Sequence, residues 1–308
     1  MSLTFEKASR RPQVFRRLTS LSVNEFLLLV EKLRPEWKKR EQMRLEGKKR
    51  RNKIGQGRPY AGSFETMVLC VIVFLRTNAG NVILSLLFNI DEVTFRTWRR
   101  RLLPLLQDRF IPNSPVQGKK KRINDLDEFL KAYPEVKELI ADGIEFKIQR
   151  PKRGQKKNYT GKSKRHVKKT VLGVNRKDGI ILGRTKIRPG SVHDKRILDE
   201  DPIHRRLDKD PALSKRADSA WTGEDPALGW LVNKRGRRAH PLTKKEKKEN
   251  RKLSKIRIGV EHAIRRVKVF RRMAETVVLR TPKLFDHSLN AAINLANFTV
   301  LVRQENDI

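Results

Sequence analysis

Apolar residues at helical spacing dominate the first 110 residues of the chain. Ser22 and Glu25 have the spacing of a capping box ahead of the apolar positions of residues 26–33. Pro35 would then end or bend this helix. Ser63 is placed to cap a second helix through the apolar run 64–77. The pattern predicts an all-α N-terminal region.

Two shorter helical patterns, residues 81–88 and 92–106, end this region. Three residues separate them, and the last of these, Asp91, is placed to cap the second helix. This is helix-turn-helix spacing, and the second helix combines an apolar stripe with a basic face. The same pattern also suits the core of any all-α domain, so two interpretations stay open. If the pair binds DNA, the expected contact residues are Thr94, Arg96, Arg99 and Arg100.

The periodicity changes after a Pro- and Lys-rich stretch. Strand patterns cover residues 137–148, 170–175 and 179–187, and Asp178-Gly179 is a hairpin signal between the last two. Alternating helix and strand patterns follow, which predicts an α/β architecture. The expected elements are a helix at 193–207, strands ending near 218 and at 229–233, and helices at 244–273 and 285–302. The expected domains are 1–110 (helical), 111–136 (linker) and 137–308 (α/β).

The charge of the chain is far outside ordinary globular composition. It has 308 residues with 72 Lys and Arg against 34 Asp and Glu, a net charge of +38. Phosphate neutralisation releases counterions, so the default partner is nucleic acid. The alternative is a basic structural protein that packs into a ribonucleoprotein. One basic run, residues 152–169, contains Tyr159 and lies between two predicted strands. It is interpreted as a loop that clamps DNA, or alternatively as a solvated loop with no specific role.

Cysteine usage and hydropathy limit the compartment. The single Cys70 excludes a disulfide framework and an ordinary thiolate zinc site. It lies in the apolar run 67–75, which ends at Arg76 and is far shorter than the ~20 apolar residues of a membrane span. Charged residues interrupt the N-terminus before any signal-peptide pattern forms. We therefore expect a cytoplasmic, nucleoid-associated protein without a membrane partner.

Three acidic residues stand out: Asp142 in the first predicted strand, Asp218 at the end of a later one, and Glu261 on the long helix. Carboxylates from separate elements can hold Mg²⁺ ions, and two ions ~3.5 to 4 Å apart stabilise an in-line phosphodiester displacement. Each acid also has a structural interpretation. Asp142 with its following glycine would be a hairpin turn, and Asp218 would cap the next segment. Glu261 would be a solvated helix charge paired with Arg257 or Arg265.

Four segments resemble one protein family. They are Ala-Asp142-Gly-Ile-Glu, Pro189-Gly-Ser-Val-His-Asp194, Ala-Asp218-Ser-Ala-Trp-Thr-Gly223 and Arg257-Ile-Gly-Val-Glu261-His-Ala-Ile-Arg-Arg-Val-Lys268. Over roughly residues 60–300 the chain resembles DDE transposases of bacterial insertion sequences, in the insertion-sequence-five branch related to eukaryotic Harbinger elements. The spacing Arg, three residues, Glu, six residues, Lys is the most specific of these signatures.

The resemblance implies a ribonuclease H-like catalytic domain preceded by an all-α helix-turn-helix domain. It implies catalysis and metal binding by one carboxylate triad, with Mg²⁺, or Mn²⁺ in its place, as cofactor. It also implies phosphate contacts from two basic residues and base stacking by one aromatic residue. The triad would be Asp142, Asp218 and Glu261; the phosphate contacts Arg257 and Lys268; and the stacking residue Trp221.

The function that the resemblance implies is DNA transposition. The enzyme would bind terminal inverted repeats, cleave DNA and transfer the strands, with double-stranded element ends and target DNA as partners. Because two ends must meet, a homodimer or higher assembly is expected. The alternatives are a ribonuclease H-fold DNA nuclease without strand transfer, a catalytically inactive DNA-binding regulator, and a basic RNA-associated structural protein. The sequence does not specify the inverted-repeat or target sequences.

Overall fold

The computed structural model describes residues 2–46, 53, 56, 59–107, 137–201, 213–217, 226–236, 238, 240–278 and 281–306. Its contacts divide the chain into two compact units. We call them the helical unit (Met1–Phe110, Val269–Met273 and Thr281–Ile308) and the sheet unit (Ile111–Lys268 and Ala274–Arg280). The predicted boundaries around the linker 111–136 adjoin residues outside the described ranges and stay predictions. Asp218 and Trp221 also lie outside the described residues.

The helical unit confirms the predicted helical N-terminal region. Its helices are α1 (Phe5–Ser9), α2 (Pro12–Thr19), α3 (Val23–Glu46), α4 (Phe64–Thr77), α5 (Asn81–Phe88), α6 (Glu92–Leu106), α12 (Arg271–Ala274) and α13 (Pro282–Asn306). Only the first three residues of α12 belong to this unit. The capping box at α3 forms: the Ser22 N–H donates to the Glu25 carboxylate at 2.6 Å, and the Glu25 N–H donates to Ser22 Oγ at 3.1 Å. Pro35 does not end α3, which continues past it as one helix to Glu46.

The core of the helical unit is built around α4, whose residues are buried from Phe64 to Leu75 apart from half-buried Glu65. The last helix, α13, also packs here: Asn294 Nδ2 donates to the Leu106 carbonyl at 3.2 Å, and His287 Nδ1 lies 2.6 Å from Gln107 Oε1. The expected domain 137–308 includes this helix. In the structure it belongs to the helical unit instead. Among the described residues, no helix is both long enough and apolar enough to cross a membrane.

The sheet unit confirms the predicted mixed α/β region. Strand β3 is antiparallel to β1 and β4, whereas β6 is parallel to both β1 and β7. The described strands run in the order β2-β3-β1-β6-β7, with β4 and β5 also paired to β3. The elements are β1 (Glu138–Lys147), α8 (Gln155–Asn158), β2 (Tyr159–Thr160), β3 (Arg165–Asn175), β4 (Ile181–Arg184), β5 (Arg188–Pro189), α9 (Asp194–Asp199), β6 (Ser214–Ala217), η2 (Pro226–Leu228), β7 (Trp230–Val232) and α11 (Lys244–Lys268).

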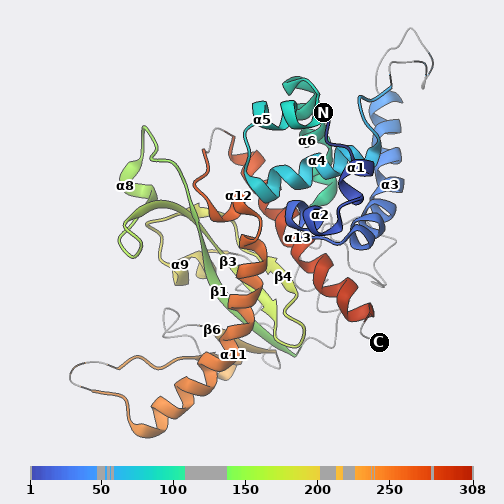
Figure 1. Ribbon diagram of the computed structural model, residues 1–308. Helices are drawn as coiled ribbons and strands as arrows, with labels where there is room; N and C mark the ends of the chain where they lie inside the picture. The colour runs from blue at the N-terminus through green and yellow to red at the C-terminus, as the bar shows by residue number, and fades with distance from the viewer. Residues whose placement is uncertain are drawn as a thin grey trace. The chain divides into compact units, whose positions relative to one another are not determined.

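The side chains of β1 divide between two helices, α9 on one face and α11 on the other. Figure 1 shows α11 running alongside β1. Leu139 and Ala141 belong to the same buried cluster as Ile197 of α9. Ile140 faces α11, because its Cδ1 lies 3.6 Å from the position of a Cβ on Gly259. Successive side chains of a strand point to opposite faces. Asp142, the residue after Ala141, therefore faces α11.

Candidate active site

Asp142 lies inside β1, where it pairs with Leu172 of β3, and Gly143 pairs with Val171. The interpretation of this dipeptide as a hairpin turn is therefore wrong. The turn signal at Asp178 is correct: Gly179 has φ of 71°, and its N–H donates to the Asn175 carbonyl at 2.9 Å. Local sequence is alike at the two sites, but only the second lies between two pairing strands.

A basic group from α11 lies close to Asp142. Arg257 Nη2 lies 3.5 Å from Asp142 Oδ2, and the two side chains are only 16% and 18% exposed. Partial burial strengthens such a pair relative to one in open solvent. The carboxylate of Asp142 is thereby held on the face of the sheet that α11 covers.

Glu261 lies four residues after Arg257, which places it on the same face of α11 one turn further along. Its side chain is exposed. Within the described ranges it forms an ion pair with neither Arg257 nor Arg265, so the expected salt-bridged arrangement is not observed. An exposed carboxylate one helical turn from Arg257 is able to bind a cation.

Lys268 closes the predicted Arg-Glu-Lys series at the C-terminal end of α11. Eleven residues separate it from Arg257, which is about 16 Å along a helix. Burial lowers the pKa of the Lys268 ammonium; Glu145 opposes this shift and Lys147 adds to it. Lys268 therefore lies toward the end of β1, away from Asp142.

A second charged cluster, which sequence reasoning missed, lies on the opposite face of β1. The buried Lys169 places its Nζ 3.4 Å from Glu145 Oε1 and 3.2 Å from Asp194 Oδ1. Gly143 allows this approach, because a Cβ there would lie 2.8 Å from Asp194 Oδ2. The sequence signal was the segment 189–194, which ends in His193, the N-cap of α9, and Asp194. This cluster ties α9 to β1 and β3 directly behind Asp142.

The carboxylates suit a hard divalent cation. Asp142 and Glu261 offer oxygen ligands, which Mg²⁺ prefers. The described residues contain no group of three His, Cys, Asp or Glu side chains that could hold a metal ion. Strand β6 ends at Ala217, next to Asp218 in the sequence, and runs parallel to β1.

Arg99, predicted to contact DNA, packs into the helical unit. Its guanidinium lies over the rings of Phe74 at 5.1 Å and Phe95 at 5.4 Å, and its Nη1 donates to Asn81 Oδ1 at 3.0 Å. Burial, and then the charge of Arg96, lower its pKa. Arg99 thus connects α6 with α4 and α5.

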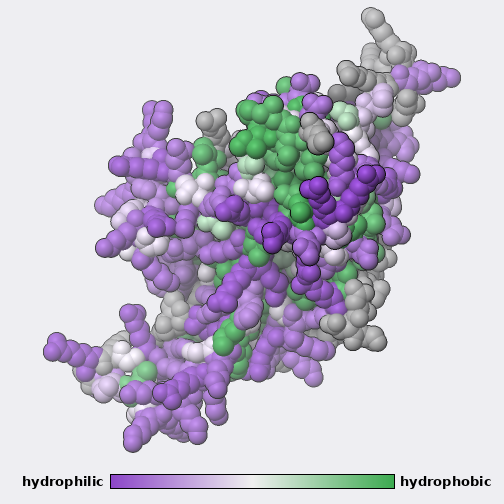
Figure 2. Space-filling view, in the orientation of Figure 1, coloured by the Kyte–Doolittle hydropathy of each residue, from purple (hydrophilic) through white to green (hydrophobic). Residues whose placement is uncertain are grey.

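The other three predicted contact residues of α6 differ in exposure. Arg96 is 57% exposed and pairs with Glu92 at 2.7 Å. Arg100 is exposed, and Thr94 is half-buried. On α5, the aliphatic side chains of Val82, Ile83 and Leu86 are also exposed. Figure 2 shows a hydrophobic area over the region of α5.

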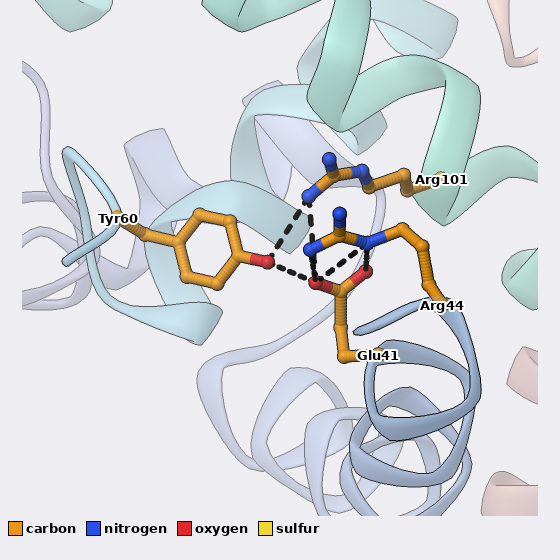
Figure 3. Close-up of polar contacts among 4 residues, drawn as sticks. All are labelled: Glu41, Arg44, Tyr60 and Arg101. Carbon is orange, nitrogen blue, oxygen red and sulfur yellow. Dashed lines mark hydrogen bonds and ion pairs between the residues drawn. The ribbon is translucent and has the colours of Figure 1, made fainter. Parts of the chain in front are cut away.

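A polar cluster that sequence reasoning missed holds α6 to α3 (Figure 3). Glu41 accepts hydrogen bonds from Arg44, at 2.8 Å, and from the Tyr60 hydroxyl. Arg101 of α6 donates to Tyr60 Oη at 3.0 Å and lies 3.4 Å from Glu41 Oε2. Burial raises the pKa of Glu41, but the hydrogen bonds of Arg44 and Tyr60 and the charges of Arg101 and Arg44 outweigh it, so the net shift is downward.

Comparisons with known proteins point to one family. The DDE superfamily endonuclease family matches residues 141–297, about half of the chain, a range that includes Asp142 and Glu261. A probable transposase for insertion sequence element IS702 of Microchaete diplosiphon is 31% identical over 170 residues. The match covers 52% of this chain and 56% of that relative, so the chain spans little more than half the length of this curated relative. No solved structure matches the chain significantly.

Proposed function

The chain belongs to the DDE superfamily endonucleases, and from that premise we propose that it is a transposase that cuts and joins DNA at the ends of a mobile element. The observation that carries the proposal is the contact between β1 and α11. Asp142 lies inside a central strand, Arg257 Nη2 lies 3.5 Å from its carboxylate, and Glu261 follows Arg257 by one helical turn. The similarity to a probable insertion-sequence transposase supports transposition over other DNA cleavage.

We propose Asp142, Asp218 and Glu261 as the catalytic carboxylates and metal ligands. Strand β6 supports the inclusion of Asp218, because it ends one residue earlier and pairs in parallel with β1. Mg²⁺ fits the oxygen donors, and Mn²⁺ can replace it; bound metal would stabilise the attacking and leaving oxygens of a phosphodiester displacement.

The chain's own residues position the reacting groups. Arg257 fixes the Asp142 carboxylate and contributes positive charge where a DNA phosphate would approach. Glu261, exposed and one helical turn from Arg257, would turn toward the same phosphate-facing side. Lys268 would contact a phosphate further along the strand, and Trp221 would stack on a displaced base.

We propose that α5 and α6 form a helix-turn-helix that recognises the terminal inverted repeats. Their bounds, with three intervening residues, support this assignment. Arg96 and Arg100 are the best placed contact residues because both project into solvent, and Thr94 is the next. Arg99 would serve by holding α6 in place. Duplex DNA is the partner, and two ends would be joined by a dimer or higher assembly.

The sheet supports a ribonuclease H-like fold for the catalytic region, through its three antiparallel strands continued by two parallel ones. The spacing from Arg257 through Glu261 to Lys268 supports the insertion-sequence-five branch. The proposed location is the bacterial cytoplasm, on the nucleoid.

Product analysis tests the proposal. The full chain is incubated with Mg²⁺, a plasmid target and a labelled duplex that carries the terminal sequence of the DNA element encoding it. Joined products are expected, with sedimentation showing at least two copies on paired ends. Cleavage without joining would replace the proposal with a nuclease of the same fold. Binding without cleavage would leave a DNA-binding regulator.

A further inference from the structure

The segment that follows β1 and runs into β3, residues 150–168, is a basic arm that the proposed catalytic chemistry does not use. It contains α8, β2 and the start of β3 (Figure 1). No Asp or Glu occurs from residue 146 to residue 177. Eight of the arm's cationic side chains are exposed and Lys168 is half-buried. The nine cationic residues are Arg150, Lys152, Arg153, Lys156, Lys157, Lys162, Lys164, Arg165 and Lys168.

The arm's positive charge is not neutralised within the described parts of the chain. None of its nine cations forms an ion pair there, whereas Lys169, the next residue, is held by Glu145 and Asp194. Burial, and then the charge of Lys157, lower the pKa of Lys168. Concentrated like charge destabilises the free chain and is relieved by a polyanion.

The arm is built as a defined structure against the sheet. Strand β2 pairs with the start of β3, and the Ser191 N–H donates to the Lys157 carbonyl at 3.2 Å. Gly190 lies under the arm, and a Cβ there would lie 2.6 Å from the Asn158 carbonyl oxygen. Only glycine allows this approach. A preorganised arm loses less entropy on binding a ligand than a loose loop does.

An aromatic side chain lies among these cations. Tyr159 is 43% exposed and stands opposite His166 across the β2–β3 pair. The two rings are 5.6 Å apart at 69°, an edge contact that supports the Tyr159 ring and leaves much of it in solvent. Exposed aromatic rings among cations form stacking sites for the bases of single-stranded nucleic acid. Bases inside a duplex are already stacked on their neighbours and do not offer their faces to such a ring.

We propose that the basic arm binds an unpaired segment of DNA, with Tyr159 stacked on a base and the arm's Lys and Arg side chains on its phosphates. Figure 2 shows hydrophilic side chains over the region of α8. The inference rests on the proposed function only in taking DNA as the substrate. The arm would hold the single strand that cleavage at an element end exposes. Neither the proposed catalytic carboxylates nor α6 has this role.

Fluorescence anisotropy of the full chain with two labelled DNAs tests the stacking contact. One probe is a blunt duplex, and the other is the same duplex with a single-stranded 3′ tail. Tyr159→Ala is expected to weaken binding of the tailed probe by about 5-fold or more and to leave the blunt probe unchanged. Tyr159→Phe, which keeps the ring, is expected to bind both probes like the wild type.

The phosphate contacts are tested by salt dependence with a charge-matched control. Lys156→Gln with Lys162→Gln removes two unpaired cations, and the slope of log K against log salt for the tail is expected to fall by about 1.4. Lys195→Gln with Arg196→Gln removes two adjacent cations of α9 that Asp199 and Glu200 already neutralise. This control is expected to leave the slope unchanged.

Two results would overturn the proposal: wild-type binding of the tailed probe by a folded Tyr159→Ala variant, or equal losses in the arm pair and the α9 pair. Tighter binding of an RNA tail of the same sequence would also contradict it. The outcomes are separable from those of the proposed function. Cleavage that depends on Asp142 while Tyr159→Ala binds normally rejects the arm alone, and a tail-specific loss without any cleavage rejects the transposase alone.

Discussion

Arg257 of α11 reaches Asp142 of β1, with Nη2 3.5 Å from Oδ2. The contact joins a strand and a helix that are 115 positions apart in sequence (257 − 142), and it sets the charge next to the proposed metal ligand. Because the two side chains are mostly buried, their interaction is weakly screened by salt.

Arg257→Gln is therefore expected to reduce DNA cleavage by about 10-fold or more, since loss of one tenfold step corresponds to only ~1.4 kcal/mol of positioning energy. Arg257→Lys should recover part of the rate, because it keeps the charge but not the planar fork. Arg265→Gln, at an exposed position of the same helix, is the control. Cleavage rates with Mg²⁺ at matched salt measure the effect, and equal rates for Arg257→Gln and Arg265→Gln would contradict it.

Lys169→Met is expected to destabilise the sheet unit. The substitution leaves Glu145 and Asp194 without their shared cation, and removing one partner of a buried ion pair costs about 3 to 5 kcal/mol. The two carboxylates are 26% and 22% exposed, so solvent screening reduces the expected loss to about 1 to 3 kcal/mol. Urea unfolding measures it, with Lys177→Met as the exposed control. A change below that of the control would show that the cluster carries no stability.

The Glu41 cluster should make the helical unit sensitive to acid. The pKa of the Glu41 carboxyl in the folded protein lies below the ordinary value of 4.5. The stabilisation by this carboxylate is therefore complete above pH 4.5 and is lost as the pH falls through the folded pKa. Glu41→Gln should therefore lose stability at neutral pH and differ progressively less from the wild type as the pH falls below 4.5. Melting temperatures across this range measure the difference, with exposed Glu31→Gln on the same helix as control. A gap that widens in acid would contradict the prediction.

Tyr60→Phe removes the two hydrogen bonds that the Tyr60 hydroxyl makes in that cluster. The hydroxyl donates to Glu41 and accepts from Arg101, so its removal is expected to cost about 1 kcal/mol. Equilibrium unfolding in urea measures the loss. Unchanged stability would indicate that water replaces the hydroxyl without cost.

Cys70 should be chemically inert in the folded protein. It is buried in α4, and burial raises the pKa of its thiol far above the ordinary value, which suppresses the reactive thiolate. A chromogenic disulfide reagent should react with this thiol only after denaturant is added. Rapid reaction of the native protein would show that α4 opens readily.

Much of the fold followed from local pattern. The capping box at Ser22, the helices of the N-terminal region and the Asp178-Gly179 turn were predicted because each depends on neighbouring residues. Asp142-Gly143 carried the same turn signal, yet it lies inside a strand, because pairing with β3 determines its conformation. Periodicity alone does not separate these two cases.

The parts of the site that sequence could not supply are long-range contacts. The sequence predicted Arg99 as a DNA-binding residue because it lies on a basic helix face. Its position over Phe74 depends instead on how α4 and α6 pack. Lys169 gave no signal in a run of basic residues, because its acidic partners lie on β1 and α9. The destination of α13 likewise depends on which unit has an open apolar surface.

The most direct test of the account is Mg²⁺-dependent cleavage and joining of a labelled element-end duplex by three proteins: the wild type, Glu261→Gln and Glu249→Gln. Both variants remove one carboxylate from α11, exposed at Glu261 and half-buried at Glu249, but only Glu261 lies one helical turn from Arg257, which reaches Asp142. The account predicts joined products from the wild type and Glu249→Gln, and neither cleavage nor joining by Glu261→Gln with DNA binding retained. Full activity of Glu261→Gln would contradict it.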